Sequence, residues 1–236
     1  MRKRKNSFLR SLLQKIKKVF IILFIVQLLY IVVLKWINPP ITLTQLVSFV
    51  EGNGLKRDYI SLQDIAPNAR LAVIASEDQL FPDHNGFDVK SIEKVITEGA
   101  KKAGRIRGAS TISQQVAKNV FLWQGRSWIR KGIEAYFTFM IEQVWGKKRI
   151  LEVYLNVAEM GKGIFGIEQA AQEYFNKPAK KLSRKEAAMI AACLPNPKKY
   201  IVNPPSRYIN QRYPWILHQM HNLEGDADIR ELTIVD

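Results

Sequence analysis

Cysteine is nearly absent from this chain of 236 residues, in which Cys193 is the single example. One cysteine excludes an intrachain disulfide framework and any zinc or iron–sulfur site that several cysteines would build. Cys193 lies in the apolar stretch 191–194, where a buried thiol is expected. Repeats and low-complexity segments are also missing, and 47% of the residues are hydrophobic, which excludes a chain that is disordered throughout. The length permits one large domain or two small ones.

Acidic residues are missing from residues 1–18, which carry eight basic residues and so hold +8 of the net charge of +15. Residues 19–34 then contain no charged residue at all. A helix needs about 20 mostly apolar residues to span a bilayer core, and lysine side chains at its ends can extend to the headgroups. We therefore predict a transmembrane anchor over 19–37. The positive-inside rule puts the basic stub 1–18 in the cytoplasm and the rest of the chain outside.

Two other interpretations of the apolar segment are weaker. A cleaved signal peptide would need a small-x-small cleavage site, but Asn38, Pro39 and Pro40 follow the segment instead. A buried helix of a globular domain would show polar residues alternating with apolar ones, and no such alternation is present. An uncleaved single-pass anchor is the interpretation that remains.

Beyond the anchor, Pro and Gly mark residues 38–68 as a connector with some strand character, and helical patterns dominate afterwards. The predicted helices cover residues 70–78, 89–102, 110–119, 127–145, 148–155, 166–175 and 187–194. Ser110 or Thr111, and the capping box from Ser183 to Glu186, supply N-terminal caps. A basic segment between glycines at 104–108 is expected to close over a cleft. Residues 69–236 are thus expected to form one mainly α domain.

Four acidic residues and a histidine lie within residues 77–88, directly after an apolar helix. Glu77 ends that helix, where a carboxylate is partly removed from water, has a raised pKa and is suited to proton transfer. A solvated helix end followed by an acidic turn explains the same residues. The residues of this cluster alone leave both interpretations open.

A second cluster, residues 108–119, is polar but mostly uncharged. Amides and hydroxyls such as these hold sugar hydroxyls and phosphate oxygens well. Thr111 and Gln115 are four residues apart, as are Gln114 and Lys118, so each pair shares a helix face. A helix N-terminus with hydroxyl side chains would also attract an anion. The alternative is an ordinary surface helix.

Cations flank a carboxylate in the third cluster, where Arg130 and Glu134 are four residues apart and Lys131 lies beside them. A simple i,i+4 salt bridge, worth about 0.3 kcal/mol, would explain the pair. The functional interpretation is that the substrate carries phosphate. Aromatic residues are interleaved with Arg126 over residues 121–129, a mixture typical of a segment that enters the bilayer interface.

Taken in order, these clusters resemble the motifs of the peptidoglycan glycosyltransferase family over about residues 70–205. The first motif is Glu77, Asp78, Phe81, His84, Gly86, Phe87 and Asp88. The second is complete from Gly108 to Asn119 except that Ser113 replaces threonine, and the third is Arg130, Lys131, Glu134 and Ala135. The fourth runs from Lys147 through Glu152 and Tyr154 to Asn156, and the fifth from Leu182 to Pro197. Five ordered motifs are far more specific than one.

The resemblance implies a mainly α, lysozyme-like domain that polymerises lipid II, a disaccharide-pentapeptide on a polyprenyl diphosphate, with inversion at the anomeric carbon. Glu77 would be the base on the acceptor 4-hydroxyl, and Glu134 would lie on the donor side. Lys118, Arg130 and Lys131 would neutralise the diphosphate. The substrate-binding residues implied by the motifs are Asp78, Phe81, His84, Ser110, Thr111, Gln114, Gln115, Lys118, Asn119, Arg130 and Lys131.

The same resemblance implies that no cofactor is required, and stimulation by Mg or Mn is left open because no ligand set is evident. His218 and His221 have metal-ligand spacing but no acidic or cysteine partner. The implied partners are lipid II, the growing glycan strand, membrane lipid and other cell-wall synthesis or division proteins. The implied location is the bacterial cytoplasmic (inner) membrane, with the catalytic domain on its outer, periplasmic face. Ser91 and Lys94 match S-x-x-K, but no S-x-N or K-S/T-G accompanies them, so no transpeptidase is expected.

Two other classes of protein fit part of the sequence. A lytic transglycosylase or muramidase shares a helical domain and a catalytic glutamate but cleaves glycan, and a neutral glycan has no diphosphate for the cations near Glu134 to bind. A membrane-tethered nucleic-acid-binding protein would fit the pI of 9.9. Over half of the excess charge lies in residues 1–18, however, where topology explains it, so no nucleic-acid partner is expected.

The predicted topology is tested by fusing alkaline phosphatase, which is active only outside the cytoplasm, after Asp236. We expect an active reporter, because the eight basic residues ahead of the apolar run retain the N-terminus inside. The same reporter fused after Lys18, ahead of the apolar run, should be inactive. An inactive reporter at Asp236 would contradict the orientation.

Overall fold

An N-terminal helix and a separate helical domain make up the chain in the computed structural model. The structure describes residues 2–89, 93, 110–125 and 127–234. Two units, Met1–Asn38 and Pro39–Asp236, each have their own internal contacts. Most of the expected helix at 89–102 and the whole basic segment at 104–108 lie outside the described residues.

The first unit is the helix α1 (Arg2–Val33) and the turn that follows it. Its segment Leu12–Val33 has a mean hydropathy of 2.4 and is long and apolar enough to cross a membrane by length and composition. Beyond the helix, the ammonium group of Lys35 lies 5.6 Å from the centre of the Trp36 ring. These features are compatible with a single-pass membrane anchor.

The second unit consists mainly of helices with one small sheet. Its α-helices are α2 (Leu43–Val50), α3 (Pro67–Glu77), α5 (Ile112–Phe121), α6 (Trp128–Val144), α7 (Lys147–Val157), α8 (Ile167–Phe175), α9 (Arg184–Cys193), α10 (Arg207–Leu223) and α11 (Ala227–Thr233). Short 3-10 helices are η1 (Leu62–Asp64) and η2 (Ala179–Lys181). The strands β1 (Lys56–Arg57), β2 (Glu159–Gly161) and β3 (Ile164–Phe165) form a sheet of order β1-β3-β2, in which β1 is parallel and β2 antiparallel to β3.

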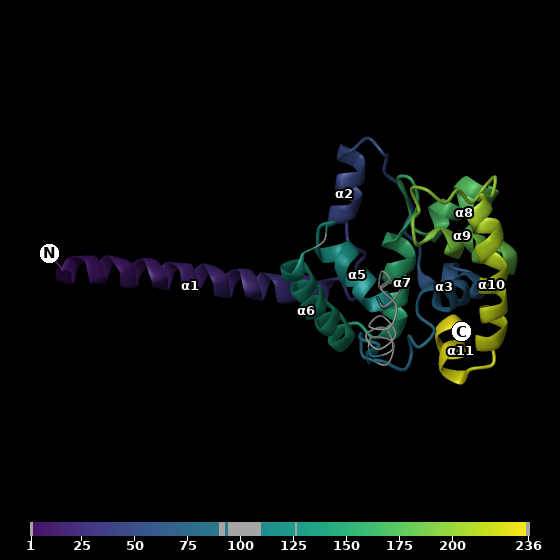
Figure 1. The fold of residues 1–236 in the computed structure, drawn as a ribbon. Helices are drawn as coiled ribbons and strands as arrows, with labels where there is room; N and C mark the ends of the chain where they lie inside the picture. Colours follow the sequence, from purple (N-terminus) through teal and green to yellow (C-terminus); the bar gives the residue numbers. More distant parts are fainter. Residues whose placement is uncertain (1, 90–92, 94–109, 126, 235–236) are drawn as a thin grey trace. The chain divides into compact units, whose positions relative to one another are not determined.

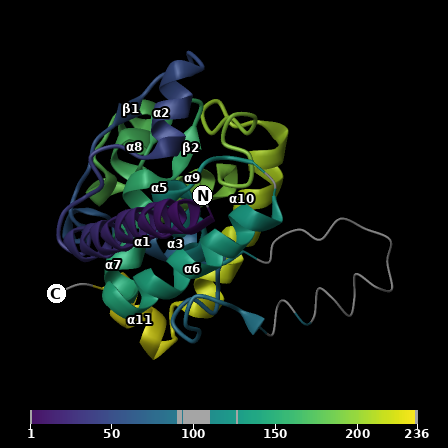
Figure 2. The same cartoon turned by 90° about the vertical axis from the view of Figure 1, so that its left-hand side faces the viewer.

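Two groups of helices share the core of this unit. The helices α3, α9 and α10 pack against one another, while α5 packs against both α6 and α7 (Figure 1). Seven of the fourteen buried side chains of α3 and α9 are alanine, which lets the two helix backbones approach closely. The helix α8 covers the small sheet at the end of the unit where α2 also lies (Figure 2). The residue that follows α3, Asp78, is hydrogen-bonded to the first residue of α5, Ile112, which joins the two groups.

Several predicted helix starts are confirmed. Thr111 caps α5 through a capping box with Gln114, and Ser183 caps α9 through a capping box with Glu186. Ser127 caps α6 by accepting a hydrogen bond from the backbone of the first turn. The predicted burial of the cysteine in α9 is also confirmed, since Cys193 is fully buried and its thiol donates to the Met160 carbonyl at 3.1 Å.

The structure differs from the sequence expectation in residues 38–68 and near the C-terminus. The expected connector contains the helix α2, capped by Thr42 and Gln45, and only two of its residues are in a strand. A helix of eight residues gives too short a periodic pattern to stand out beside Pro and Gly. The helices α10 and α11 were not predicted, and α10 contains Pro214, which obscures its pattern. Between α6 and α7 the chain breaks at Gly146, whose φ is 75°, instead of continuing as helix.

Gly163 shows how tightly the small sheet is packed against residues that precede it in the chain. Its φ is +69°, and a Cβ at this position would lie 2.1 Å from the carbonyl oxygen of Asn53. The carbonyl of Gly163 accepts the backbone N–H of Lys56 at 2.8 Å. A side chain at this position would therefore separate β1 from the turn before β3.

We expect Gly163→Ala to lower the free energy of unfolding by about 2 kcal/mol more than Gly146→Ala. Both glycines have a positive φ, but a Cβ at Gly146 meets no atom within 4 Å, so the comparison cancels the backbone strain and isolates the clash. Urea unfolding of the full chain in detergent, followed by tryptophan fluorescence, measures the difference. Equal losses in the two variants would contradict the close packing at Gly163.

Candidate active site

Glu77 is the last residue of α3, and its carboxylate is held on both sides. Gln115 donates from Nε2 to Oε2 of Glu77 at 2.9 Å, and the Ser76 hydroxyl donates to Oε1 at 3.2 Å. Burial raises the pKa of Glu77 above its ordinary value, and the two hydrogen bonds and the charge of Arg212 act in the opposite direction. The raised pKa predicted from its place at a helix end is confirmed.

The turn that follows Glu77 is fixed to the start of α5. Oδ2 of Asp78 accepts the backbone N–H of Ile112 at 2.9 Å, and Nε2 of His84 donates to Oδ1 of Asp78 at 3.0 Å. Nδ1 of His84 accepts the N–H of Gly86, which identifies Nε2 as the donor nitrogen. Thr111 donates its hydroxyl to the Gly86 carbonyl at 2.7 Å. The turn is therefore held through both of its ends.

Phe81 completes this turn by packing into the core. Its side chain is fully buried, and the ammonium group of Lys147 lies 4.6 Å from the centre of its ring. Four residues expected to bind substrate are thus occupied in packing and internal hydrogen bonds, namely Asp78, Phe81, His84 and Thr111. None of the four lines either of the two cavities described below.

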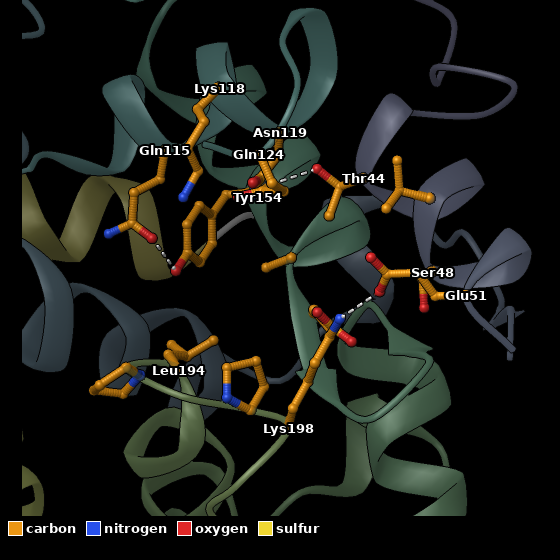
Figure 3. A pocket seen from close by; sticks show the side chains of 15 residues that line it. Thr44, Ser48, Glu51, Gln115, Lys118, Asn119, Gln124, Tyr154, Leu194 and Lys198 are labelled. Atoms are coloured by element: carbon orange, nitrogen blue, oxygen red, sulfur yellow. Dashed lines mark hydrogen bonds and ion pairs between the residues drawn. The ribbon is translucent and has the colours of Figure 1, made fainter. Parts of the chain in front are cut away.

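Two cavities share a wall formed by α5 and the residues just after it. One of about 400 Å³ is lined by α2, α5 and α7 and includes Asn119 and Tyr154 (Figure 3). The other, of about 500 Å³, is lined by α5 and α6. Gln115, Lys118 and Gln124 line both cavities. The remaining expected residues Ser110, Gln114, Arg130, Lys131 and Glu134 line the second cavity.

Cations in the second cavity surround a single carboxylate. Glu134 is buried, and it accepts hydrogen bonds from Arg130 at 2.6 Å and from Lys131. Burial lowers the pKa of Lys118, the charge of Glu134 raises it, and Arg130 and Lys131 lower it further. Among the described residues, Nε of Arg130 is buried without a hydrogen-bond partner. Three cations around one carboxylate leave an excess of positive charge, which an anionic group can neutralise.

The pair of Arg130 and Glu134 is the predicted i,i+4 salt bridge, but its environment differs from that of a surface pair. The side chains are only 11% and 4% exposed. Breaking a buried pair leaves an uncompensated charge and costs about ten times more than breaking an exposed one. The pair therefore contributes to the stability of the site as well as to its charge.

Two residues of the site had no role assigned from the sequence. Tyr154 on α7 donates its hydroxyl to Oε1 of Gln115 at 3.1 Å. The positive charge of Arg212 on α10 lowers the pKa of Glu77. The guanidinium carbon of Arg212 lies 3.7 Å from the centre of the Trp215 ring. Tyr154 belongs to the fourth motif, which could have indicated it, whereas no pattern in the sequence marks Arg212.

No metal site is evident in the part of the chain that the structure describes, where no group of three His, Cys, Asp or Glu residues could hold an ion. His221 lies 2.7 Å from a carboxylate oxygen of Glu224, and Nδ1 of His218 contacts the side-chain amides of Gln219 and Asn222. The two histidines therefore have local partners along α10.

The domain that follows the apolar helix in the chain is mainly helical, and it holds a desolvated carboxylate and a cationic cluster that both contact α5, an arrangement typical of an enzyme that transfers a group from an anionic substrate. Residues 44–221 match the family described as Transglycosylase. Biosynthetic peptidoglycan transglycosylases of Escherichia coli strain K12 / DH10B and of Shigella boydii serotype 4 are each 59% identical over 174 residues, which cover 74% of this chain and 72% of theirs. That of Escherichia coli strain 55989 is 60% identical over the same coverage.

The chain belongs to the transglycosylase family. The resemblance stated from the five motifs is confirmed, and so is the mainly α, lysozyme-like fold class. The assignment of individual catalytic and substrate-binding residues stays a prediction, which the contacts above make specific.

We expect Glu134→Ala to lower the free energy of unfolding by about 3 kcal/mol, because it leaves the buried Arg130 guanidinium without its carboxylate. Urea unfolding of the full chain in detergent measures the loss. Lys180→Ala is the matched control, since it breaks an exposed ion pair with Asp64 and should leave the unfolding midpoint unchanged. Similar midpoints for the two variants would show that Glu134 is not held in a buried pair.

Proposed function

We propose that the protein polymerises lipid II into linear glycan strands for the bacterial cell wall and releases polyprenyl diphosphate. The observation that carries the proposal is the presence of two chemically different groups beside α5. Glu77, a carboxylate of raised pKa, is hydrogen-bonded to Gln115 of this helix, and an excess of cations surrounds Glu134 in the cavity that Gln115 and Lys118 also line. Membership in the transglycosylase family and the names of the relatives support the same reaction.

The proposed reaction transfers the glycan from a diphosphate to a hydroxyl. Glu77 takes the proton of the acceptor 4-hydroxyl as its oxygen attacks the anomeric carbon, and the bond from that carbon to the diphosphate oxygen breaks. Attack from the face opposite the leaving group turns an α-linked diphosphate into a β-1,4 glycosidic bond. A carboxylate with a raised pKa suits this step, because the ionised form is then a stronger base toward the acceptor proton.

The departing diphosphate gains negative charge in the transition state and needs fixed positive charge nearby. We propose that Lys118, Arg130 and Lys131, which line the second cavity, supply it. Glu134 holds two of these cations in position and so acts on the donor side through them. We propose this orienting role for Glu134 in place of a proton transfer to the leaving group.

We also propose that α1 anchors the enzyme in the cytoplasmic membrane with the catalytic domain on the outer face. The first residues of α6, Trp128 and Ile129, are 92% and 77% exposed, which suits contact with the bilayer interface. They begin the same helix that carries Arg130 and Glu134, so a lipid-linked diphosphate in the membrane plane would lie within reach of the cations. Other cell-wall synthesis or division proteins are proposed as partners, and we propose that the reaction requires no cofactor.

A lytic transglycosylase is the competing function. It would cleave a neutral glycan, for which the cations on α5 and α6 have no role. Incubation with purified lipid II separates the two functions, because a synthase makes polymer and a lytic enzyme makes none.

The proposed base is tested with Glu77→Gln, which keeps the shape of the side chain but cannot accept the proton. We expect polymerisation of lipid II by the detergent-solubilised protein to fall at least about 100-fold, with an unchanged melting temperature. Lys118→Ala is expected to lower kcat strongly as well, because it removes a charge that stabilises the leaving group.

In the unmodified enzyme, the acid limb of the pH–rate profile should lie above the ordinary pKa range of glutamate, since burial raises the pKa of Glu77. Activity would be lost as the pH falls through that raised value. Near-normal polymerisation by Glu77→Gln would exclude this residue as the base, and near-normal kcat in Lys118→Ala would exclude the lysine from leaving-group stabilisation.

A further inference from the structure

Gln115 lies between the proposed base and a buried phenol. Its Nε2 donates to Oε2 of Glu77 at 2.9 Å. Figure 3 shows its other bond, in which Oε1 accepts the hydroxyl of Tyr154 at 3.1 Å. An ionised carboxylate accepts hydrogen bonds and never donates them. The amide must therefore present its NH2 group to Glu77 and its oxygen to Tyr154, and a phenol is suited to meet that oxygen because it can donate.

Tyr154 is rigidly placed. It is 1% exposed on α7, in a stretch where seven of the helix residues are buried. Burial, followed by the charge of Glu77, raises the pKa of Tyr154 well above its ordinary value, so the phenol keeps its proton and remains a donor. Gln115 is partly exposed and lines both cavities, so its amide has more freedom than the phenol.

We infer that Tyr154 is a positioning residue for the proposed reaction, which acts through Gln115 to hold one oxygen of Glu77 and leave the other oxygen to receive the proton. The inference rests on the proposed function, since it presumes that Glu77 is the base. It assigns the two carboxylate oxygens to different tasks, with Oε2 bound to the amide and Oε1 directed to the acceptor hydroxyl.

Ser76 explains how Oε1 becomes available. Its hydroxyl donates to Oε1 of Glu77 at 3.2 Å, and the carbonyl oxygen of Ala191 lies 3.4 Å from the same hydroxyl. A hydroxyl has one proton, so it can turn to the carbonyl without losing a partner when an acceptor sugar arrives. Gln115 has no such alternative, because turning its amide would place its oxygen against the carboxylate of Glu77, two acceptors face to face.

Charged and titratable groups reach Glu77 from each element around it. They are Asp78 on the following turn, Lys118 on α5, Tyr154 on α7, Cys193 on α9 and Arg212 on α10. Of these, Tyr154 is the one linked to Glu77 through a side-chain amide. Replacing it with phenylalanine removes one hydrogen bond and leaves every ionised group in place.

The experiment compares Tyr154→Phe with the unmodified full-length enzyme in detergent, by lipid II polymerisation across a range of pH. We expect kcat to fall about tenfold, KM to stay within about twofold, and the acid limb to move to higher pH. The direction of this shift follows from the hydrogen bonds. Without the phenol, the amide of Gln115 is less well ordered and its hydrogen bond to the carboxylate of Glu77 is weaker. The charged form of Glu77 is then less favoured, and the pKa of Glu77 rises.

The matched control is Tyr174→Phe. It also removes a phenol that donates to an internal carbonyl, that of Met160 at 2.9 Å, but it lies outside the chain of hydrogen bonds to Glu77. The acid limb of this variant should coincide with that of the unmodified enzyme. A loss of packing alone would change the melting temperature of either variant without moving the acid limb.

A double-mutant cycle adds a second measurement. Gln115→Leu removes the link between the phenol and the carboxylate, so Tyr154→Phe should have no further effect on the acid limb in that background. Additive shifts would overturn the inference. Should Tyr154→Phe fail to fold, Gln115→Asn, which shortens the amide side chain and leaves the buried tyrosine intact, is expected to give the same shift.

The outcomes for the positioning role and for the proposed function are distinct. Absence of polymer with the unmodified enzyme, or full activity of Glu77→Gln, would overturn the proposed function. Polymerisation that depends on Glu77 but shows the same acid limb in Tyr154→Phe and the unmodified enzyme would overturn the positioning role alone.

Discussion

The hydrogen bond from the Ile112 backbone to Asp78 is the constraint on which the geometry of the site depends. It joins the residue after Glu77 to the first turn of α5, and at 2.9 Å with a carboxylate acceptor it is a strong bond. An N–H in the first turn of a helix has no partner within that helix, so a carboxylate can bind it there at little cost. His84 holds the other oxygen of Asp78. With α3 and α5 fixed at this point, Glu77 and Gln115 meet without any further adjustment.

This constraint also explains why part of the first two motifs lies away from the cavities. Asp78, His84 and Thr111 have the polar side chains expected of ligands, but their partners are in the protein itself. Residues of this kind are needed at fixed positions because the turn must present a carboxylate to α5 and a carbonyl to Thr111. The same residue types bind ligands and stabilise turns, so the spacing of these residues along the chain does not show which of the two roles they have.

Local signals explain what could be predicted from the sequence, and tertiary contacts explain what could not. Capping residues such as Thr111 and Ser183 act within four residues, so the starts of α5 and α9 were predicted correctly. The raised pKa of Glu77 followed from its position at the end of an apolar helix. The charge of Arg212 reaches Glu77 only because α10 packs against α3, and α10 left no clear pattern in the sequence. The cations around Glu134 were predicted as a group, but the burial of Arg130 and Glu134 was not.

The helix α5 sets the distance between the two halves of the proposed reaction. Gln115 holds the base and Lys118 belongs to the cations, and they are three residues apart on one face, which separates them by about 4.5 Å along the helix axis. One rigid helix thus supports both the proposed base, through Gln115, and Lys118, a proposed ligand of the diphosphate. Insertion of a single residue between them would rotate one by about 100° and move it off the shared wall. A loop could not keep the two groups in register, because its backbone would not fix their separation, and this is a physical reason for both groups to lie on one helix.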